Sequence, residues 1–461
     1  MSSLASTSRV RLRGARRAAP AVLAALALGC AAGNETSNTG GAEGGGGSAL
    51  SPPTSVTSAS SSSSSSITSS SSASSSASAS ASTGATGGGG HASGGGGAGG
   101  DAAGGAGGAN AGGASSTGGG GGAVVQHLVA IAVGADGIEG ARYDQGTASW
   151  VTTDLGGAST DPPAITFDGD GTACAGVRST SNGGELDFTL WSAGTWTPLA
   201  QLAADQTLSP PSMSGGQGLI DLVFQGAIGQ GMNKFFFDRR DTTWSVTDEA
   251  VSASGVQSFG PTAAAIARTG ADDLLAYTGD DANVYTQVRT NGLWQTAQSH
   301  LTVGQAALFS PALVVLPGST NWLLVFVDGA HAIEFAAHSS AGWTQPVVVA
   351  GALSSGTPAL AALPSGDAEL VYEGQDGFGY AARWSASTGL WAASAPLSSP
   401  SVALASPPAI APGVGSAEAE IAYVASTGVV THTRLVAGSL GETSQIGSAT
   451  TFTAVALASQ R

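Results

Sequence analysis

Basic and aromatic side chains that could bind a ligand recur at one position in the C-terminal part of this sequence. Each lies shortly before a polar turn, in segments that otherwise contain few basic residues. An Arg beside an aromatic ring can clamp a sugar or a carboxylate through guanidinium hydrogen bonds and ring stacking. The alternative is that each Arg pairs with an acid of the neighbouring repeat on the outer surface. The predicted ligand-binding set is Arg142, Tyr143, Trp191, Arg240, Tyr285, Arg289, His338, Arg383, Trp384 and Arg434.

Other kinds of chemistry find little support in the sequence. Cys174 lies in GTACAGV, an alternating run of small residues that favours a buried side chain over a nucleophile. The acidic pairs Asp168/Asp170 and Asp280/Asp281 could offer oxygen ligands to calcium, but Asp and Gly are also typical of tight hairpin turns. The His residues are not spaced as HxH or HExxH, and neither a G-x-S-x-G elbow nor a P-loop occurs. We therefore predict no catalytic residue, no metal and no cofactor.

Two sets of residues repeat with one shared period and indicate which elements position these side chains. Trp residues at polar turns recur every 46 to 50 residues, at Trp150, Trp196, Trp244, Trp294, Trp343 and Trp391. Pro residues that precede small apolar segments recur every 47 to 50 residues, at Pro163, Pro211, Pro261, Pro311, Pro358 and Pro408. An aromatic residue at a fixed repeat position usually packs one unit against the next. We therefore interpret the Trp set as structural, with sugar stacking as the alternative.

Each period contains four short segments, most of which alternate apolar and polar residues. Between Pro261 and Trp294 they are GPTAAAIARTG, DDLLAYTGDD, NVYTQVRTNG and the segment that Trp294 opens. Four strands per repeat predict a blade of a β-propeller. Six repeats with Trp and a seventh with Leu440 in its place predict an all-β, seven-bladed β-propeller, with six blades as the alternative. The first repeat lacks its first strand, so we expect the C-terminal strand TTFTAVALAS to complete blade 1.

The succession of strand, DG-type turn, strand, polar turn and Trp resembles the fucose-type propeller lectins over residues 124–461. In that family the sugar is held by an Arg on the second strand, a Glu on the third and an aromatic residue of the next blade. Here second strands such as LLAYTG and LLVFVDG lack the Arg, and only Glu139 and Glu334 offer a third-strand acid. The resemblance therefore implies the fold without the family's sugar site. Sialidases are disfavoured, because TLWSAGTW and DRRDTTW do not match the Asp-box S-x-D-x-G-x-[ST]-W.

The N-terminal segment predicts export and a tether. Residues 1–29 carry five Arg and then a short apolar run, as a secretion signal does. The run ends in LALGC, which resembles the lipobox of bacterial lipoproteins and implies a lipid on Cys30, although Ala27 stands where that family prefers Leu. Residues 30–122 are dominated by Ser, Gly and Ala, a composition typical of a disordered linker. Residues 123–461 then form the propeller.

The charge of the exported chain restricts its partners. Removal of residues 1–29 leaves ten basic and 31 acidic residues, a net charge of −21, and Lys234 is its single Lys. Phosphate binding needs clustered Lys and Arg, so nucleic acid is excluded as a partner. With Cys30 lipidated, Cys174 has no disulfide partner, and the core alone must stabilise the domain.

These features predict an exported protein, lipid-anchored at the outer membrane or cell surface, that binds a glycan or protein ligand without catalysis. We expect a monomer whose contact with the membrane is the N-terminal lipid. The first alternative is a propeller hydrolase or lyase, in which polar residues would converge at the axis. The second is a structural module of envelope assembly.

Overall fold

The computed structural model describes the C-terminal propeller region. Described are residues 126–180, 183–226, 234–245, 249–251, 262–270, 272–299, 306–398, 401–448 and 451–460. The predicted signal peptide, Cys30, the linker and Pro261 lie outside these ranges. Within the described ranges, no helix is long and apolar enough to cross a membrane.

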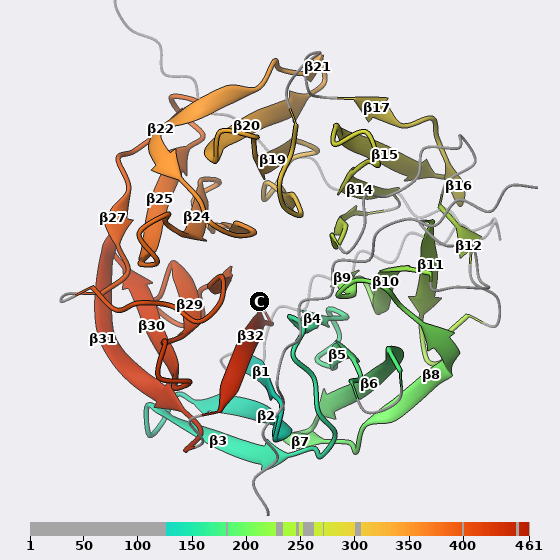
Figure 1. The fold of residues 1–461 in the computed structure, drawn as a ribbon, viewed down its shortest axis with the longest axis vertical. Coiled ribbons are helices and arrows are strands. Elements are labelled where there is room, and N and C mark those ends of the chain that lie inside the picture. The colour runs from blue at the N-terminus through green and yellow to red at the C-terminus, as the bar shows by residue number, and fades with distance from the viewer. Residues whose placement is uncertain are drawn as a thin grey trace, which may run out of the picture. The chain divides into compact units, whose positions relative to one another are not determined.

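Seven antiparallel sheets follow one another around a ring (Figure 1). Blade 1 consists, from the axis outward, of β32 (Phe452–Ser459), β1 (Leu128–Gly134), β2 (Gly137–Asp144) and β3 (Ser149–Asp154). Blade 2 consists of β4 (Ala164–Phe167), β5 (Ala173–Arg178), β6 (Glu185–Ser192), β7 (Thr195–Trp196) and β8 (Ala200–Gln206). Blade 3 consists of β9 (Ser212–Gly216), β10 (Leu219–Gln225), β11 (Phe235–Arg240) and β12 (Glu249–Ala250).

The remaining four blades repeat this order. Blade 4 consists of β13 (Ala265–Thr269), β14 (Asp272–Thr278), β15 (Val284–Thr290), β16 (Leu293–Trp294) and β17 (Gln298–Ser299). Blade 5 consists of β18 (Ala312–Val315), β19 (Trp322–Val327), β20 (Ala332–Ser339), β21 (Gly342–Trp343) and β22 (Val347–Leu353). Blade 6 consists of β23 (Ala359–Ala362), β24 (Ala368–Glu373), β25 (Gly379–Ser385), β26 (Leu390–Trp391) and β27 (Ala395–Pro396). Blade 7 consists of β28 (Ala409–Pro412), β29 (Ala419–Val424), β30 (Val430–Val436) and β31 (Ser439–Ile446).

The ring closes within blade 1, where the C-terminal strand β32 pairs with β1. The antiparallel register runs from Leu128 opposite Ser459 to Val133 opposite Ala454. On its flanks β32 contacts the innermost strands of blades 7 and 2, so the seven innermost strands surround the axis without a gap. The all-β, seven-bladed propeller is thus confirmed, and the six-bladed alternative is excluded.

The core lies between blades. Strands β1, β19 and β29 are buried along their whole length, because each second strand is covered on both faces by neighbouring blades. This explains why a segment such as WLLVFV is continuously apolar instead of alternating. Apolar clusters accordingly combine residues of adjacent blades, as Phe335 of blade 5 does with Leu370 and Trp384 of blade 6.

The Trp ladder also lies at the blade boundaries. Trp residues of the outer strands pack edge-to-face on third-strand rings of the preceding blade, with ring centroids 5.6 to 5.8 Å apart, in the pairs Trp244–Phe188, Trp294–Phe237 and Trp391–Phe335. Trp196 covers Gly140 so closely that a Cβ atom at Gly140 would lie 2.7 Å from the indole ring. These contacts support the structural interpretation of the ladder.

Candidate functional site

The structure places the ten predicted ligand-binding residues on the third strands β2, β6, β11, β15, β20, β25 and β30. They are distributed over all seven blades instead of being gathered at one site. Third strands face neighbouring blades, so the surroundings of each side chain decide whether it is free to meet a ligand.

Arg289 takes part in an ion-pair network between blades 3 and 4. Its Nη2 lies 2.8 Å from Oε2 of Glu249, which belongs to blade 3. Its Nη1 lies 3.5 Å from Oδ2 of Asp273 on the neighbouring strand β14. The guanidinium also lies 4.6 Å from the centre of the Phe237 ring, a cation–π distance. Arg289 therefore joins two blades.

Two further Arg residues complete this network. Arg239 donates to Asp221 in its own blade (Nε to Oδ1, 2.6 Å) and to Asp273 across the boundary (Nη2 to Oδ2, 2.6 Å). Arg268 bridges the same two carboxylates, with Nη1 2.7 Å from Asp221 Oδ2 and 3.4 Å from Asp273 Oδ1. Both carboxylates are fully buried. Burial and the charge of Asp221 raise the pKa of Asp273 to about 7, although Arg239 and Arg268 oppose the shift.

Arg383 and Arg434, two further members of the predicted set, also contact acids. Arg383 of blade 6 donates to Glu369 in its own blade (Nε to Oε2, 3.0 Å) and to Glu418 of blade 7 (Nη2 to Oε2, 2.6 Å). Arg434 of blade 7 lies 3.1 Å from Oε1 of the buried Glu420 and donates to the carbonyl oxygen of Val414. These contacts hold the Arg side chains in the structure.

A simple register rule underlies these pairs. In four blades an acid on the second strand lies directly opposite an Arg on the third, in the pairs Asp221–Arg239, Asp273–Arg289, Glu369–Arg383 and Glu420–Arg434. All four acids belong to the same blade as the Arg opposite, whereas the alternative expects an acid of the neighbouring blade. Arg239, Arg289 and Arg383 each have such a partner as well. That these Arg residues bind a ligand stays a prediction.

The predicted aromatic residues are mostly part of the core. Trp191, Tyr143 and Trp384 are buried in the clusters between blades. His338 lies between the rings of Trp322 and Trp343, and burial lowers its pKa. The three buried side chains present little surface to a ligand, and His338 is half-buried.

Arg142, Arg240 and Tyr285 are half-buried members of the set that lie outside the ion-pair networks. Arg142 and Arg240 form no ion pair with any residue that the structure describes. Tyr285 is half-buried; its ring stacks on Tyr277, and its hydroxyl donates to Asp281 Oδ2 at 2.6 Å. They remain candidates for ligand contact.

Cys174 and Asp168, considered as a nucleophile and as a calcium ligand, have surroundings typical of a core residue and of a turn residue. Cys174 is buried, and burial raises the pKa of its thiol to about 12, so the thiol stays protonated at neutral pH. Asp168 Oδ1 accepts hydrogen bonds from the backbone amides of Asp170 and Thr172, as a turn-forming Asp does. Within the described ranges, no three His, Cys, Asp or Glu side chains are grouped so that they could hold a metal ion.

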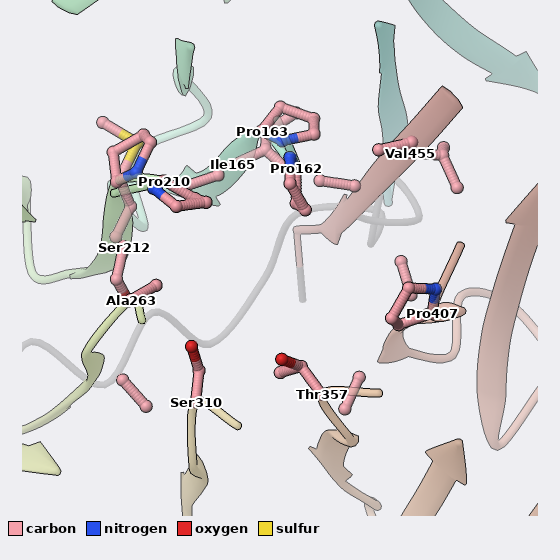
Figure 2. Close-up of a pocket in the computed structure, with 18 of the residues that line it drawn as sticks. Pro162, Pro163, Ile165, Pro210, Ser212, Ala263, Ser310, Thr357, Pro407 and Val455 are labelled. Atoms are coloured by element: carbon pink, nitrogen blue, oxygen red, sulfur yellow. The ribbon is translucent and has the colours of Figure 1, made fainter. Parts of the chain in front are cut away.

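A cavity of about 330 Å³ opens at the axis, where the innermost strands of all seven blades begin or pass. The described members of the Pro ladder line it, and in blades 2, 3 and 7 a second Pro stands beside them (Figure 2). We call it the proline-rimmed cavity; the rim consists of Pro162, Pro163, Pro210, Pro211, Pro311, Pro358, Pro407 and Pro408. The hydroxyl groups of Ser310 and Thr357 face the central space (Figure 2). None of the described lining residues is charged.

A second axial cavity, of about 480 Å³, is lined by residues from the innermost strands of blades 2 to 7 and by Pro317. Arg268 is its one charged lining residue among those described, and its side chain is nearly buried between Asp221 and Asp273. The guanidinium therefore faces its carboxylate partners instead of standing free in the cavity.

The proline-rimmed cavity was not among the sites predicted from the sequence, although its signal was present. Six Pro residues at one repeat position necessarily meet at the axis once the repeat is a closed propeller blade. Sites of 300 to 1,000 Å³ that are mostly apolar, with a few placed polar groups, are typical for small ligands. The cavity is at the small end of this range, enough for one sugar ring or one side chain of a protein.

No protein-family model matches the sequence, and no curated protein matches it. Solved structures do. A periplasmic gluconolactonase from Pseudomonas aeruginosa has 14% identity and a TM-score of 0.50, over 72% of this chain and 99% of that chain. A fucose-specific lectin from Aleuria aurantia has 16% identity and a TM-score of 0.44, over 58% and 89%. Apo AztD from Citrobacter koseri has 9% identity and a TM-score of 0.45, over 73% and 99%.

The fucose-specific lectins predicted from the sequence are thus among the similar structures. Likeness at such low identity shows the propeller architecture alone, and a propeller fold fixes neither a ligand nor a reaction. Function must therefore be argued from the surfaces of this chain.

Proposed function

We propose that this protein is a non-catalytic binding protein of the bacterial cell surface. A lipid on Cys30 would anchor it, residues 30–122 would serve as the tether, and the propeller would take an uncharged group of a glycan or protein ligand into the proline-rimmed cavity. The observation that carries the proposal is the lining of this cavity, which is built by all seven blades and offers Pro, Ala and hydroxyl groups without a charge.

The distribution of charge supports the same proposal. The described Arg–acid contacts of the third strands lie within blades or between neighbouring blades, and none includes a residue that lines the proline-rimmed cavity. Pro rings are rigid, so their exposed faces lose little conformational entropy when they pack against a ligand. Ser310 and Thr357 can donate to and accept from an uncharged polar group such as a sugar hydroxyl.

The alternative function, a propeller hydrolase or lyase, rests on the second axial cavity. Arg268 lines this cavity, and the pKa of its partner Asp273 is close to neutrality, as a general acid or base requires. Asp273 and Asp221 are fully buried, however, and no oxygen of either is exposed to a substrate. The binding proposal is therefore the stronger.

A glycan array and a panel of envelope proteins, probed with a soluble chain that begins at Ala31, test the proposal. A Thr357→Arg variant places a long charged side chain at the cavity and should weaken binding of the strongest ligand by at least about tenfold. Thr147→Arg, on the exposed turn between β2 and β3, is the matched control and should bind as the unaltered chain does. Equal binding by both variants would exclude the cavity.

The anchor needs a separate test. In the full-length protein, Cys30→Ser should abolish labelling by a fatty-acid analogue and move the protein from the membrane fraction to the soluble fraction. Labelling that persists in the variant would contradict a lipid on Cys30.

A further inference from the structure

The outer strand of blade 5 differs from the other outer strands of the propeller. Strand β22 has the sequence VVVAGAL, with neither a charged residue nor a Pro. The other outer strands of six or more residues, β3, β8 and β31, each contain an acid. Natural edge strands are usually protected by charges or Pro, because free backbone groups at an edge can pair with another strand. Strand β22 lacks this protection.

The side chains of β22 are also unusually exposed. Val347, Val348 and Leu353 have 54%, 50% and 46% of their surface exposed, and they are three of the seven large apolar residues that the described chain exposes. One edge of β22 pairs with β20, and no described strand pairs with the other edge. Figure 1 shows β22 on the outer rim of the ring, beside blade 6.

A cavity of about 480 Å³ lies beside the C-terminal half of β22. Ala350, Gly351 and Leu353 line it from blade 5, and Tyr372 and Tyr380 line it from blade 6. The two Tyr rings stack with centroids 5.6 Å apart and an angle of 22° between their planes. The cavity therefore joins the exposed apolar strand to an aromatic wall.

One carboxylate gives this cavity its charge. The hydroxyl of Tyr380 donates to Asp376 Oδ2 at 2.6 Å, and this hydrogen bond lowers the pKa of the exposed Asp376. Asp376 is therefore ionised at neutral pH, and no Lys, Arg or His occurs among the described residues that line the cavity. A cation can pair with Asp376 and lie near the Tyr380 ring, whereas an anion would be repelled.

Blade 4 contains the same hairpin without the apolar strand. The pattern Tyr-x-Gly-x-Asp-x-x-x-Tyr occurs as residues 277–285 and again as residues 372–380. In blade 4 the rings of Tyr277 and Tyr285 stack at 5.7 Å and 22°, and Tyr285 donates to Asp281 at 2.6 Å. The hairpin itself is thus a structural device, and the neighbouring β22 is what distinguishes blade 6. The duplication supplies a matched control.

We propose that an extended, basic segment of a partner protein docks here, adding a strand to the free edge of β22 and placing a Lys or Arg side chain at Asp376 and Tyr380. Backbone hydrogen bonds along the edge supply affinity, and the cavity selects the cation. A second copy of this chain fits poorly, because each exported copy has a net charge of −21 and would bring another Asp376 instead of a cation. The surface is separate from the proline-rimmed cavity.

Peptide binding by the soluble chain that begins at Ala31 tests this proposal. The probes are a fluorescent peptide that alternates Val and Lys, one that alternates Val and Glu, and a Val–Lys peptide with Pro at alternate positions. The first should bind, and the other two should bind at least about tenfold more weakly, the second through repulsion and the third through loss of edge pairing. Equal binding of the Val–Lys and Pro-containing peptides would overturn strand addition.

Matched variants locate the site. Val348→Lys should weaken binding of the Val–Lys peptide about tenfold or more, whereas Val151→Lys, which adds the same charge to an exposed Val on β3, should leave it unchanged. Asp376→Asn should weaken binding severalfold, and Asp281→Asn in the blade 4 hairpin should not. Thermal unfolding checks that each variant is folded. Equal effects within either pair would overturn the proposal.

The same variants distinguish this proposal from self-association through β22 and from ligand binding in the proline-rimmed cavity. A chain that dimerises, and that Val348→Lys makes monomeric, would show that the edge pairs with a second copy, which contradicts the proposal. Thr357→Arg should leave binding of the Val–Lys peptide unchanged, so failure at the proline-rimmed cavity and failure at β22 give different results.

Discussion

Two blade boundaries of this propeller are built in opposite ways. Between blades 3 and 4, three Arg and three acids form a network around Asp221 and Asp273, both fully buried. Between blades 5 and 6, the contact consists of apolar residues such as Phe335, Leu370 and Trp384. At the charged boundary the two buried carboxylates pair with Arg residues, whereas the apolar boundary lies beside an exposed strand and an open cavity. The buried charges of the first boundary thus pair with one another, whereas the described lining of the cavity beside the second is uncharged apart from Asp376.

Loss of Arg268 should have the largest effect, because it leaves both buried carboxylates short of a partner. Arg268→Met should lower the free energy of unfolding by about 3–5 kcal/mol at pH 7. Chemical denaturation followed by Trp fluorescence measures this. A loss below about 1 kcal/mol would show that Arg239 and Arg289 suffice and that the charged boundary does not depend on Arg268.

The apolar boundary should respond to a change of volume instead of charge. Phe335→Ala removes the ring that packs against Trp391 and should lower the free energy of unfolding by about 3 kcal/mol. The same denaturation experiment, repeated at pH 5 and pH 7, should give equal losses at both values. A loss that changed with pH would mean that ionisable groups also stabilise this boundary.

The free energy of unfolding should depend on pH through Asp273, which belongs to the charged boundary and not to the apolar one. The pKa of Asp273 is about 7 in the folded protein and lies near 3.8 in the unfolded chain, so the folded state binds the proton more tightly. The stabilisation from this proton is complete below about pH 4 and is lost as the pH rises through 7. Between pH 4 and 7 the unfolding free energy of the Asp273→Asn variant should therefore decline less than that of the unaltered protein. Parallel curves would contradict the raised pKa.

Arg142 should give the smallest effect of the series. It forms no ion pair with any described residue, so Arg142→Ala should change the free energy of unfolding by less than about 0.5 kcal/mol. A larger loss would mean that Arg142 also has a structural partner, and it would no longer serve as a probe of ligand contact.

The fold could be predicted from the sequence because the repeat is redundant. The Trp and Pro ladders share one period, and four strands per period leave few architectures other than a propeller. The register within a blade could also be predicted, because a short hairpin fixes which residues face each other. This register places Asp221 opposite Arg239. The acids on the second strands were therefore the sequence signal for these pairs.

Contacts between blades could not be predicted from the sequence in the same way. Arg239 reaches Asp273 only because of the angle between blades 3 and 4, which no local pattern specifies. The exposure of β22 likewise depends on its place as an outer strand of blade 5, which pairs with β20 along one edge only. The convergence of the Pro residues at the axis followed from the closed ring. The hydroxyl groups at the cavity come from Ser310 and Thr357, which occupy the position directly before the ladder Pro, where blades 2, 3 and 7 carry another Pro.

We propose that the glycan or protein ligand is bound at the axis and not by the Arg residues of the third strands. Titration of the strongest ligand from the array against Thr357→Arg and Arg142→Ala, side by side, tests this claim most directly. We predict a loss of affinity of at least about tenfold for Thr357→Arg and an unchanged dissociation constant for Arg142→Ala. The reverse result, with binding lost in Arg142→Ala and kept in Thr357→Arg, would contradict the account.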